Sequence, residues 1–203
     1  MIAAFHRFNI VQRLLHWLMA ICIIAMFFIG VGMVSTVKPI YLPLIITHET
    51  LGTVIFVLVW IRVVVRIRFG APPLPADLPA PIKIVAVLSQ YALYGLMIVM
   101  PALGWAMLSA ENYPITLYWH TNLPPILPQS ESAHTWLWRA HHYLAFAFFA
   151  LVLMHVAAAL FHALVRRDGV FETMALVPIG DDVPHIDPKV RQYERQRVGQ
   201  DRA

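Results

Sequence analysis

Four long apolar segments constrain the fold of this chain more than any other feature of its sequence. They cover residues 14–34, 44–65, 84–108 and 140–165. Each has the roughly 20 mostly apolar residues that a helix needs to cross the hydrocarbon of a bilayer. Hydrophobic residues make up 60% of the chain and charged residues only 13%, against about 25% charged residues in soluble domains. Because backbone polar groups in lipid must be satisfied internally, the segments predict an all-α integral membrane fold, a bundle of four transmembrane helices.

The distribution of lysine and arginine predicts which side of the membrane each loop occupies. Four spans put both termini on one side, and that side carries 13 of the 15 Lys and Arg residues. The opposite side carries only Lys38 and Arg139. By the positive-inside rule, both termini are expected in the cytoplasm. The basic excess is explained by this topology, so nucleic-acid binding is not needed to account for it.

We expect a membrane domain, residues 1–176, followed by a polar cytoplasmic tail, residues 177–203. A proline-rich cytoplasmic linker, residues 69–82, joins the second and third spans. The outer loop, residues 109–135, is longer and is predicted to include a short interfacial helix near His134. The first apolar run is too long for a cleavable signal peptide and lacks a small-residue cleavage site, so it is expected to remain as a span.

The fourth span is unusual because a strongly apolar stretch, RAHHYLAFAFFALVLMHVAAALFH, holds four histidines. An ionisable residue inside a membrane is costly and by default marks function, although a lone histidine can also simply hydrogen-bond a neighbouring helix. His141 and His155 are 14 residues apart. At about 100° per residue they lie only about 40° apart on one helix face, and about 21 Å apart along the axis. His142 points about 140° away from His155, so we expect it at the interface or in a hydrogen bond.

Each of these two histidines has a potential partner at the matching depth of another span. His16 lies near the inner end of the first span, opposite His155, and His48 lies near the outer end of the second, opposite His141. Two imidazoles that face each other across a bundle are typical axial ligands of a haem iron. Zinc prefers four tetrahedral ligands, typically with cysteine or carboxylates, and no cysteine is near. The spacing predicts an inner haem held by His16 and His155 and an outer haem held by His48 and His141.

Four further residues would complete the surroundings of these haems. Gly30 and Gly52 would make room for the macrocycles, or simply for close packing of the helices. Arg62, at the inner level of the second span, would pair with a haem propionate, or would anchor the span at the membrane surface. His162, at the inner end of the fourth span, would hydrogen-bond a quinone or a propionate, or would sit in the interface.

The sequence resembles the prokaryotic cytochrome b561 family of four-helix di-haem membrane cytochromes over about residues 5–176. The resemblance is carried by RLLHW around His16, by THETLG and WIRVVVRIRF in the second span, by MPALGWAML in the third and by the histidine-bearing stretch of the fourth. It implies two non-covalent b-type haems, a bacterial inner membrane and electron exchange with the quinone pool. The chain looks most like the members that act as superoxide oxidases, which oxidise periplasmic superoxide and reduce ubiquinone. By that resemblance His162 would lie near the quinone.

Other functions are compatible with the same residues. The chain could be an electron-transfer subunit of a periplasmic dehydrogenase or other redox protein, or a transporter in which the histidines relay protons; a purely structural anchor fits the histidine geometry poorly. Superoxide is an anion, which a positive outer surface would attract. The outer side instead carries more acidic than basic residues: Lys38 and Arg139 against Glu49, Glu111 and Glu131. The expected partners are membrane lipid and a quinone, with superoxide or a redox protein on the periplasmic side.

Overall fold

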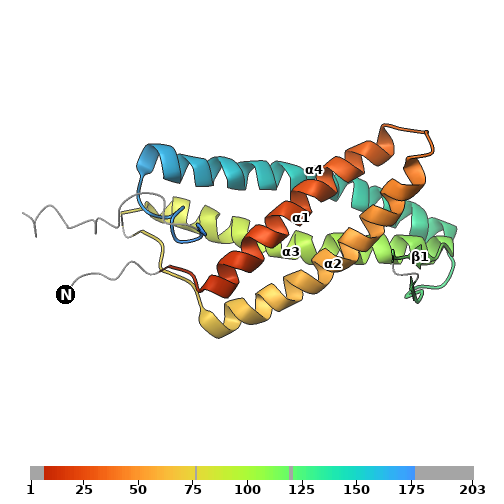
Figure 1. The fold of residues 1–203 in the computed structure, drawn as a ribbon, viewed down its shortest axis with the longest axis horizontal. Helices are drawn as coiled ribbons and strands as arrows, with labels where there is room; N and C mark the ends of the chain where they lie inside the picture. The colour runs from red at the N-terminus through yellow and green to blue at the C-terminus, as the bar shows by residue number, and fades with distance from the viewer. Residues whose placement is uncertain (1–6, 76, 119–120, 177–203) are drawn as a thin grey trace, which may run out of the picture.

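The computed structural model describes residues 7–75, 77–118 and 121–176 and consists mainly of four long helices (Figure 1). They are α1 (Ile10–Val34), α2 (Tyr41–Phe69), α3 (Ala80–Glu111) and α4 (Glu131–Phe161), the last followed by a turn of π-helix, η1 (His162–Arg166). All four are long and apolar enough to cross a membrane. The prediction of an all-α membrane fold with four helices is confirmed. Each helix extends beyond its predicted span at one or both ends. The proposed polar tail, residues 177–203, lies outside the described residues.

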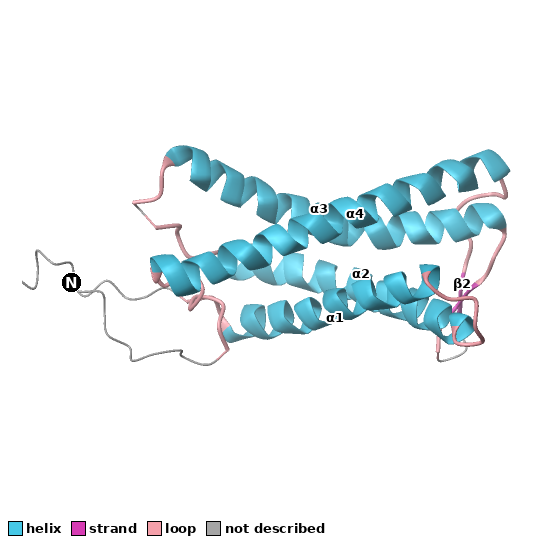
Figure 2. Ribbon diagram, turned by 90° about the horizontal axis from the view of Figure 1, so that it is seen from above, coloured by secondary structure: helices cyan, strands magenta, loops and turns pink. Residues whose placement is uncertain are grey.

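The helices are arranged as two antiparallel hairpins. α1 packs along α2, and α3 packs along α4, while the contacts between the hairpins are fewer and come mainly from α2 and α3. Figure 2 shows α1 and α2 on one side of the bundle and α3 and α4 on the other. Residues that reach from α1 or α2 to α4 must therefore bridge the two hairpins with their side chains.

We call the end of the bundle that holds both the first and the last described residues the inner end. Local sequence signals determine where the helices begin or stop there. Asn9 caps α1 in a capping box with Gln12. The buried Gln12 amide also donates to the carbonyl of Gly70, 2.9 Å away, where α2 ends. Gly70 has a φ of 69°, a conformation that favours glycine. The backbone nitrogen of Phe8 donates to the carbonyl of Thr173 at 3.1 Å, so the two ends of the described chain lie against each other.

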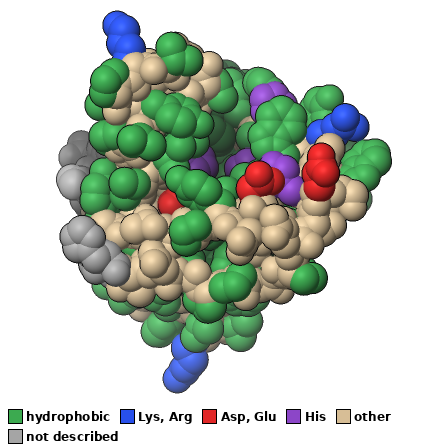
Figure 3. All heavy atoms as spheres, turned by 90° about the vertical axis from the view of Figure 1, so that its right-hand side faces the viewer, with side chains coloured by type: hydrophobic (Ala, Val, Ile, Leu, Met, Phe, Trp, Pro, Cys, Tyr) green, Lys and Arg blue, Asp and Glu red, His purple; other side chains and the backbone are tan. Residues whose placement is uncertain are grey.

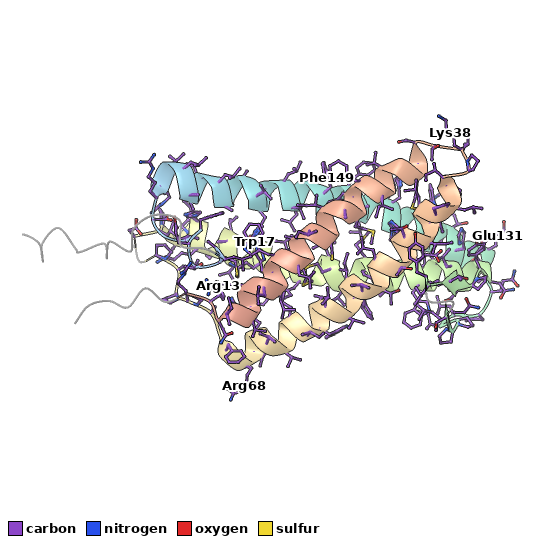
Figure 4. All side chains as sticks on the ribbon, in the orientation of Figure 1. Arg13, Trp17, Lys38, Arg68, Glu131 and Phe149 are labelled. Carbon is purple, nitrogen blue, oxygen red and sulfur yellow. The ribbon has the colours of Figure 1, made fainter. Side chains whose placement is uncertain are left out.

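Charged side chains mark the two ends of the bundle. Figure 4 shows Arg13 and Arg68 at the inner end and Lys38 and Glu131 at the opposite, outer end. The uneven distribution of basic residues thus follows the long axis of the bundle. That the inner end faces the cytoplasm stays a prediction of the positive-inside rule.

The prediction of a separate interfacial helix near His134 is wrong. α3 continues through Pro101 to Glu111, and α4 already begins at Glu131, so His134 belongs to the first turn of α4. Ser130 caps α4, because its hydroxyl accepts a hydrogen bond from the amide of Ala133. A hydropathy window misses this start because a polar cap and a polar first turn do not look like a membrane span.

The outer loop contains a small feature that the sequence did not predict. Two short strands, β1 (Ile115–Thr116) and β2 (Asn122–Leu123), pair antiparallel, and β1 packs against α2. Leu117, just after β1, is 2% exposed. The loop is therefore a packed part of the outer end.

Buried apolar side chains form a cluster in the interior of the bundle: Met19, Ile23, Ile55, Val59, Met97 and Phe148. Ile23, Ile55 and Phe148 each follow by seven residues a histidine that the sequence predicts as a haem ligand. Seven residues are nearly two helical turns, so these side chains share a face with the histidines. We call these three residues the middle layer. Most other large apolar side chains of the helices point outwards and are exposed, as expected for helices that lipid surrounds.

Candidate functional site

The inner pair consists of His16 on α1 and His155 on α4. Their ring centroids are 6.2 Å apart, and the ring planes are inclined by 70°. In the described part of the chain, α1 and α4 make few close backbone contacts. The two imidazoles therefore approach each other across the gap between the hairpins.

The outer pair consists of His48 on α2 and His141 on α4. Their ring centroids are also 6.2 Å apart, with the planes inclined by 63°. Nδ1 of each ring is buried without a hydrogen-bond partner among the described residues. A buried polar atom that lacks a partner costs about 1–3 kcal/mol, so two such atoms together point to a function.

The separation in both pairs suits one metal ion between two imidazoles. A metal–nitrogen bond of about 2.0 Å and a ring centre about 1.1 Å behind the nitrogen give centroids about 6.2 Å apart in a linear arrangement. Within the described ranges, no group of three or more His, Cys, Asp or Glu residues is arranged to hold a metal. Each pair thus offers two protein ligands, which fits a haem iron, whose macrocycle supplies the others, and does not fit a tetrahedral zinc site.

Arg62 of α2 lies beside the inner pair. Its Nη2 is 3.2 Å from Nδ1 of His16, its Nε donates to the hydroxyl of Tyr94 at 2.9 Å, and its Nη1 is buried without a partner among the described residues. A small cleft adjoins the guanidinium and is lined by Phe8, Gln12, Arg62, Arg66, Tyr94 and Met174. A buried guanidinium with an unused donor is suited to binding a carboxylate.

The glycines around the outer pair differ in what they face. A Cβ at Gly30 would meet no described atom within 4 Å, and one at Gly52 would meet only Cε of Met26, at 3.7 Å. Both positions are compatible with a flat macrocycle lying against the helices. Gly104 of α3 lies against the outer pair itself, because a Cβ there would stand 3.5 Å from Cε1 of His141. No role was predicted for Gly104, although the motif MPALGWAML contains it.

The outer loop is attached to the turn of α2 that carries His48. The amide of Thr116 donates to a carboxylate oxygen of Glu49 at 3.2 Å, and the amide of Tyr118 donates to the hydroxyl of Thr50 at 3.3 Å. The Tyr118 hydroxyl is 2.6 Å from that of Thr47. The three residues of α2 flank His48 in the sequence. Their polar character within an apolar helix was the only signal of this attachment.

His162, the last of the four histidines in the fourth predicted span, is half-buried at the inner end. Its Nδ1 is 2.8 Å from Oδ2 of Asp168, which also accepts a hydrogen bond from Nε of Arg166 at 2.8 Å. Burial alone would raise the pKa of the Asp168 carboxyl. The hydrogen bonds from His162 and the amide of Val170, with the nearby positive charge, outweigh burial and hold that pKa below its usual value. Sequence reasoning found His162 but missed Asp168, which looks like one charge among several in RRDG.

His142 does not take part in either pair. It is exposed, and its ring stacks on that of Trp138 with the centroids 5.3 Å apart and the planes inclined by 8°. It lies away from the face shared by His141 and His155, as the helical phase predicted.

Comparisons with known proteins find similarity over most of the chain. The family model described as prokaryotic cytochrome b561 matches residues 7–175. Cytochrome b561 homolog 2 of Escherichia coli (strain K12) is 27% identical over 171 residues, which cover 83% of this chain and 90% of that protein. Cytochrome b561 homolog 1 of the same organism is 25% identical over 166 residues, which cover 80% of this chain and 93% of that protein.

Proposed function

Because the chain belongs to the prokaryotic cytochrome b561 family, we propose that this b-type membrane cytochrome holds two haems b and transfers electrons from superoxide at its outer end to ubiquinone. The family supports haem b binding and electron transfer; the number of haems and both substrates are our proposal. The observation that carries it is the repetition of one arrangement, since two histidine pairs at different depths have the same centroid separation of 6.2 Å.

Each pair is proposed to hold one haem. His16 and His155 would hold the inner haem, and His48 and His141 would hold the outer haem. Bound haem supplies the one-electron chemistry. The chain fixes the ligands on rigid helices and excludes water, and the apolar middle layer keeps the two sites apart. With both termini in the cytoplasm of a bacterium, the outer pair would lie near the periplasmic face of the inner membrane.

Arg62 is proposed to bind a propionate of the inner haem. A guanidinium can only donate hydrogen bonds, so in its contact with Arg62 the Nδ1 of His16 must accept. When the other ring nitrogen of a histidine binds a metal, Nδ1 usually carries the proton and needs an acceptor instead. Ligation through Nε2 would thus release Arg62 from His16. The freed Nη2 and the buried Nη1 together suit a bidentate carboxylate.

Gly30 and Gly52 are proposed to give the outer macrocycle its room. The open space at Gly30 and the single contact at Gly52 support this assignment. His162 is proposed to contact ubiquinone. It is half-buried at the start of η1, seven residues beyond His155, and its hydrogen bond to Asp168 uses Nδ1, which leaves Nε2 available.

A second candidate function is supported by the charge of the outer end. Figure 3 looks at this end and shows acidic and histidine side chains near its middle, with the basic side chains at its margin. Such a surface does not attract an anion such as superoxide but favours a basic partner. In this alternative the chain is the electron-transfer subunit of a periplasmic dehydrogenase or another redox protein and has no substrate of its own.

One experiment on the purified protein tests the function in two steps. Pyridine haemochrome quantification with a reduced-minus-oxidised spectrum is expected to give two haems b per chain. Superoxide generated enzymatically is then expected to drive the reduction of ubiquinone-1, followed by ultraviolet absorbance. One haem or none per chain would contradict the paired sites. Two haems without superoxide-driven reduction would leave the cytochrome intact and favour the second candidate.

A further inference from the structure

A hydrogen-bonded cluster lies at the inner end, beyond the paired histidines. Its members are His162 and Arg166 of η1, Asp168 just after it, and Asp77 from the linker between α2 and α3. Oδ2 of Asp168 accepts from both His162 and Arg166, and Arg166 also forms an ion pair with Asp77. The side chains of His162 and Asp168 are only 18% and 13% exposed, whereas that of Asp77 is 71% exposed. The carboxylate of Asp168 and the ring of His162 are thus in contact and largely shielded from solvent.

The backbone is shaped to bring Asp168 back to His162. The helix widens into η1, and the amide of Arg167 donates to the carbonyl of His162 at 2.7 Å. Arg167 then adopts a left-handed conformation, with a φ of 51°, which is uncommon for a residue other than glycine. Turns of π-helix occur frequently at functional sites. The amide of Val170 donates to the second carboxylate oxygen at 3.3 Å, so Asp168 is fixed from both sides.

This geometry selects one form of the His162 ring. An ionised carboxylate can only accept, so Nδ1 of His162 must carry a proton towards Asp168. In the neutral ring Nε2 is then the unprotonated nitrogen, and the hydrogen bond to Asp168, made by Nδ1, leaves it available. When Nε2 takes up a proton, Nδ1 keeps its own proton directed at Asp168. In other enzymes the same division of roles lets an aspartate orient a histidine that transfers protons.

We propose that Asp168 is a positioning residue that makes His162 the proton donor to ubiquinone at the inner end of the bundle; the inference rests on the proposed function. Reduction of a quinone to a quinol requires two electrons, which the cytochrome supplies, and two protons. The imidazolium gives its Nε2 proton to one quinone oxygen and becomes neutral with its Nδ1 proton still directed at Asp168. Nε2 then recovers a proton from water at this end, and a repeated transfer completes the quinol.

The surrounding charges favour this role. Asp168 interacts with the charges of His162 and Arg166, and its depressed pKa keeps it ionised at neutral pH. The guanidinium of Arg166 can only donate hydrogen bonds, so it orients the carboxylate. Asp77 contacts only Arg166 among these residues and is largely exposed. Asp77 therefore offers a matched control, because it is an aspartate of the same cluster that does not touch His162.

The test compares Asp168→Asn with Asp77→Asn, His162→Gln and the double variant His162→Gln with Asp168→Asn, each checked for unchanged haem content. The reduced cytochrome is mixed with ubiquinone-1, and its reoxidation is followed by the haem absorbance between pH 6 and pH 9. Asp168→Asn is expected to slow reoxidation about tenfold or more, within the range of general acid catalysis, and most strongly at high pH. Asp77→Asn is expected to change the rate less than about twofold, as for an exposed ion pair.

A second readout does not depend on turnover. In protein labelled with ¹⁵N-histidine, the His162 signals, assigned by their absence in His162→Gln, are expected to show the Nδ1-protonated ring and to lose that preference in Asp168→Asn. An unchanged rate and ring form in Asp168→Asn would overturn the proposal. So would an equal slowing by Asp168→Asn when His162 is already glutamine. If ubiquinone-1 fails to reoxidise even the unaltered protein, the proposed function itself is wrong.

Discussion

The inner and outer histidine pairs have the same separation but different surroundings. Both have ring centroids 6.2 Å apart. The inner pair lies beside the guanidinium of Arg62, whereas the residue next to His48 in the outer pair is Glu49, whose carboxylate accepts a hydrogen bond from the loop. The helices thus hold the two histidine pairs at the same ring separation. The neighbouring side chains differ in charge, positive beside the inner pair and negative beside the outer pair.

This difference predicts the direction of electron flow. A positive charge near a haem stabilises the reduced form and raises its potential, and a negative charge lowers it. We therefore expect the inner haem to have the higher potential and to receive electrons from the outer one. The direction agrees with a superoxide donor at the outer end and a quinone acceptor at the inner end.

The largest effect is expected from removing one ligand of each pair. His141→Ala should lose the outer haem and keep the inner one, and His155→Ala should do the reverse, because each substitution leaves an iron with a single protein ligand. Haem quantification and difference spectra measure both outcomes. His142→Ala, next in the sequence but stacked on Trp138, should keep both haems. Loss of a haem in His142→Ala would show that the helical phase assigned to α4 is wrong.

The next largest effect is expected from a substitution in α3 that affects only the outer pair. Gly104→Leu should force His141 aside and reduce outer haem occupancy below about half, whereas Gly104→Ala should keep it, because an added Cβ lies at an ordinary contact distance of 3.5 Å. Gly95→Leu is the control, since a Cβ at Gly95 meets no described atom within 4 Å. Equal occupancy in Gly104→Leu and Gly95→Leu would mean that α3 does not support the outer pair.

A smaller effect concerns the charge beside the inner pair. Arg62→Gln should lower the midpoint potential of the inner haem by about 60 mV, a tenfold change for a one-electron couple, and should leave the outer haem nearly unchanged. A spectroelectrochemical titration of the two haems checks this. Arg62→Lys keeps the charge and should restore most of the potential. An equal shift of both haems would contradict the assignment of Arg62 to the inner one.

The smallest effect is a raised midpoint potential of the outer haem, opposite in sign to the change expected for the inner haem. Glu49→Gln removes a negative charge but keeps an oxygen that can accept from the amide of Thr116. It should raise the potential of the outer haem by roughly 10–30 mV, because a half-buried carboxylate is partly screened by solvent. The same titration measures it. A lowered potential of the outer haem would show that the charge of Glu49 does not distinguish the outer pair from the inner pair in the way proposed.

The sequence predicted those features that depend on one helix at a time. Apolar segments located the four helices, because crossing lipid demands length and hydrophobicity. The 14-residue spacing of His141 and His155 predicted a shared face, because the helical period is fixed. The structure brings each of these histidines to the partner expected from its depth.

Features that depend on a turn after a helix, or on side chains that reach another segment outside the histidine pattern, were missed. Gly104 matters because it faces His141 on another helix, and no pattern within α3 records that contact. Asp168 reaches His162 only because the chain turns back at Arg167. The attachment of the outer loop to Glu49 likewise joins residues that are 67 positions apart. Local periodicity contains none of this information.

The middle layer has a consequence for how the protein responds to the membrane voltage. Ile23, Ile55 and Phe148 form an apolar barrier between two sites that are about 21 Å apart along α4. The hydrocarbon is about 30 Å thick, so an electron that moves between the sites crosses roughly two-thirds of the field. A voltage of 100 mV then changes the transfer free energy by about 1.5 kcal/mol. Electron transfer through this protein is therefore expected to speed up or slow down with the energisation of its membrane.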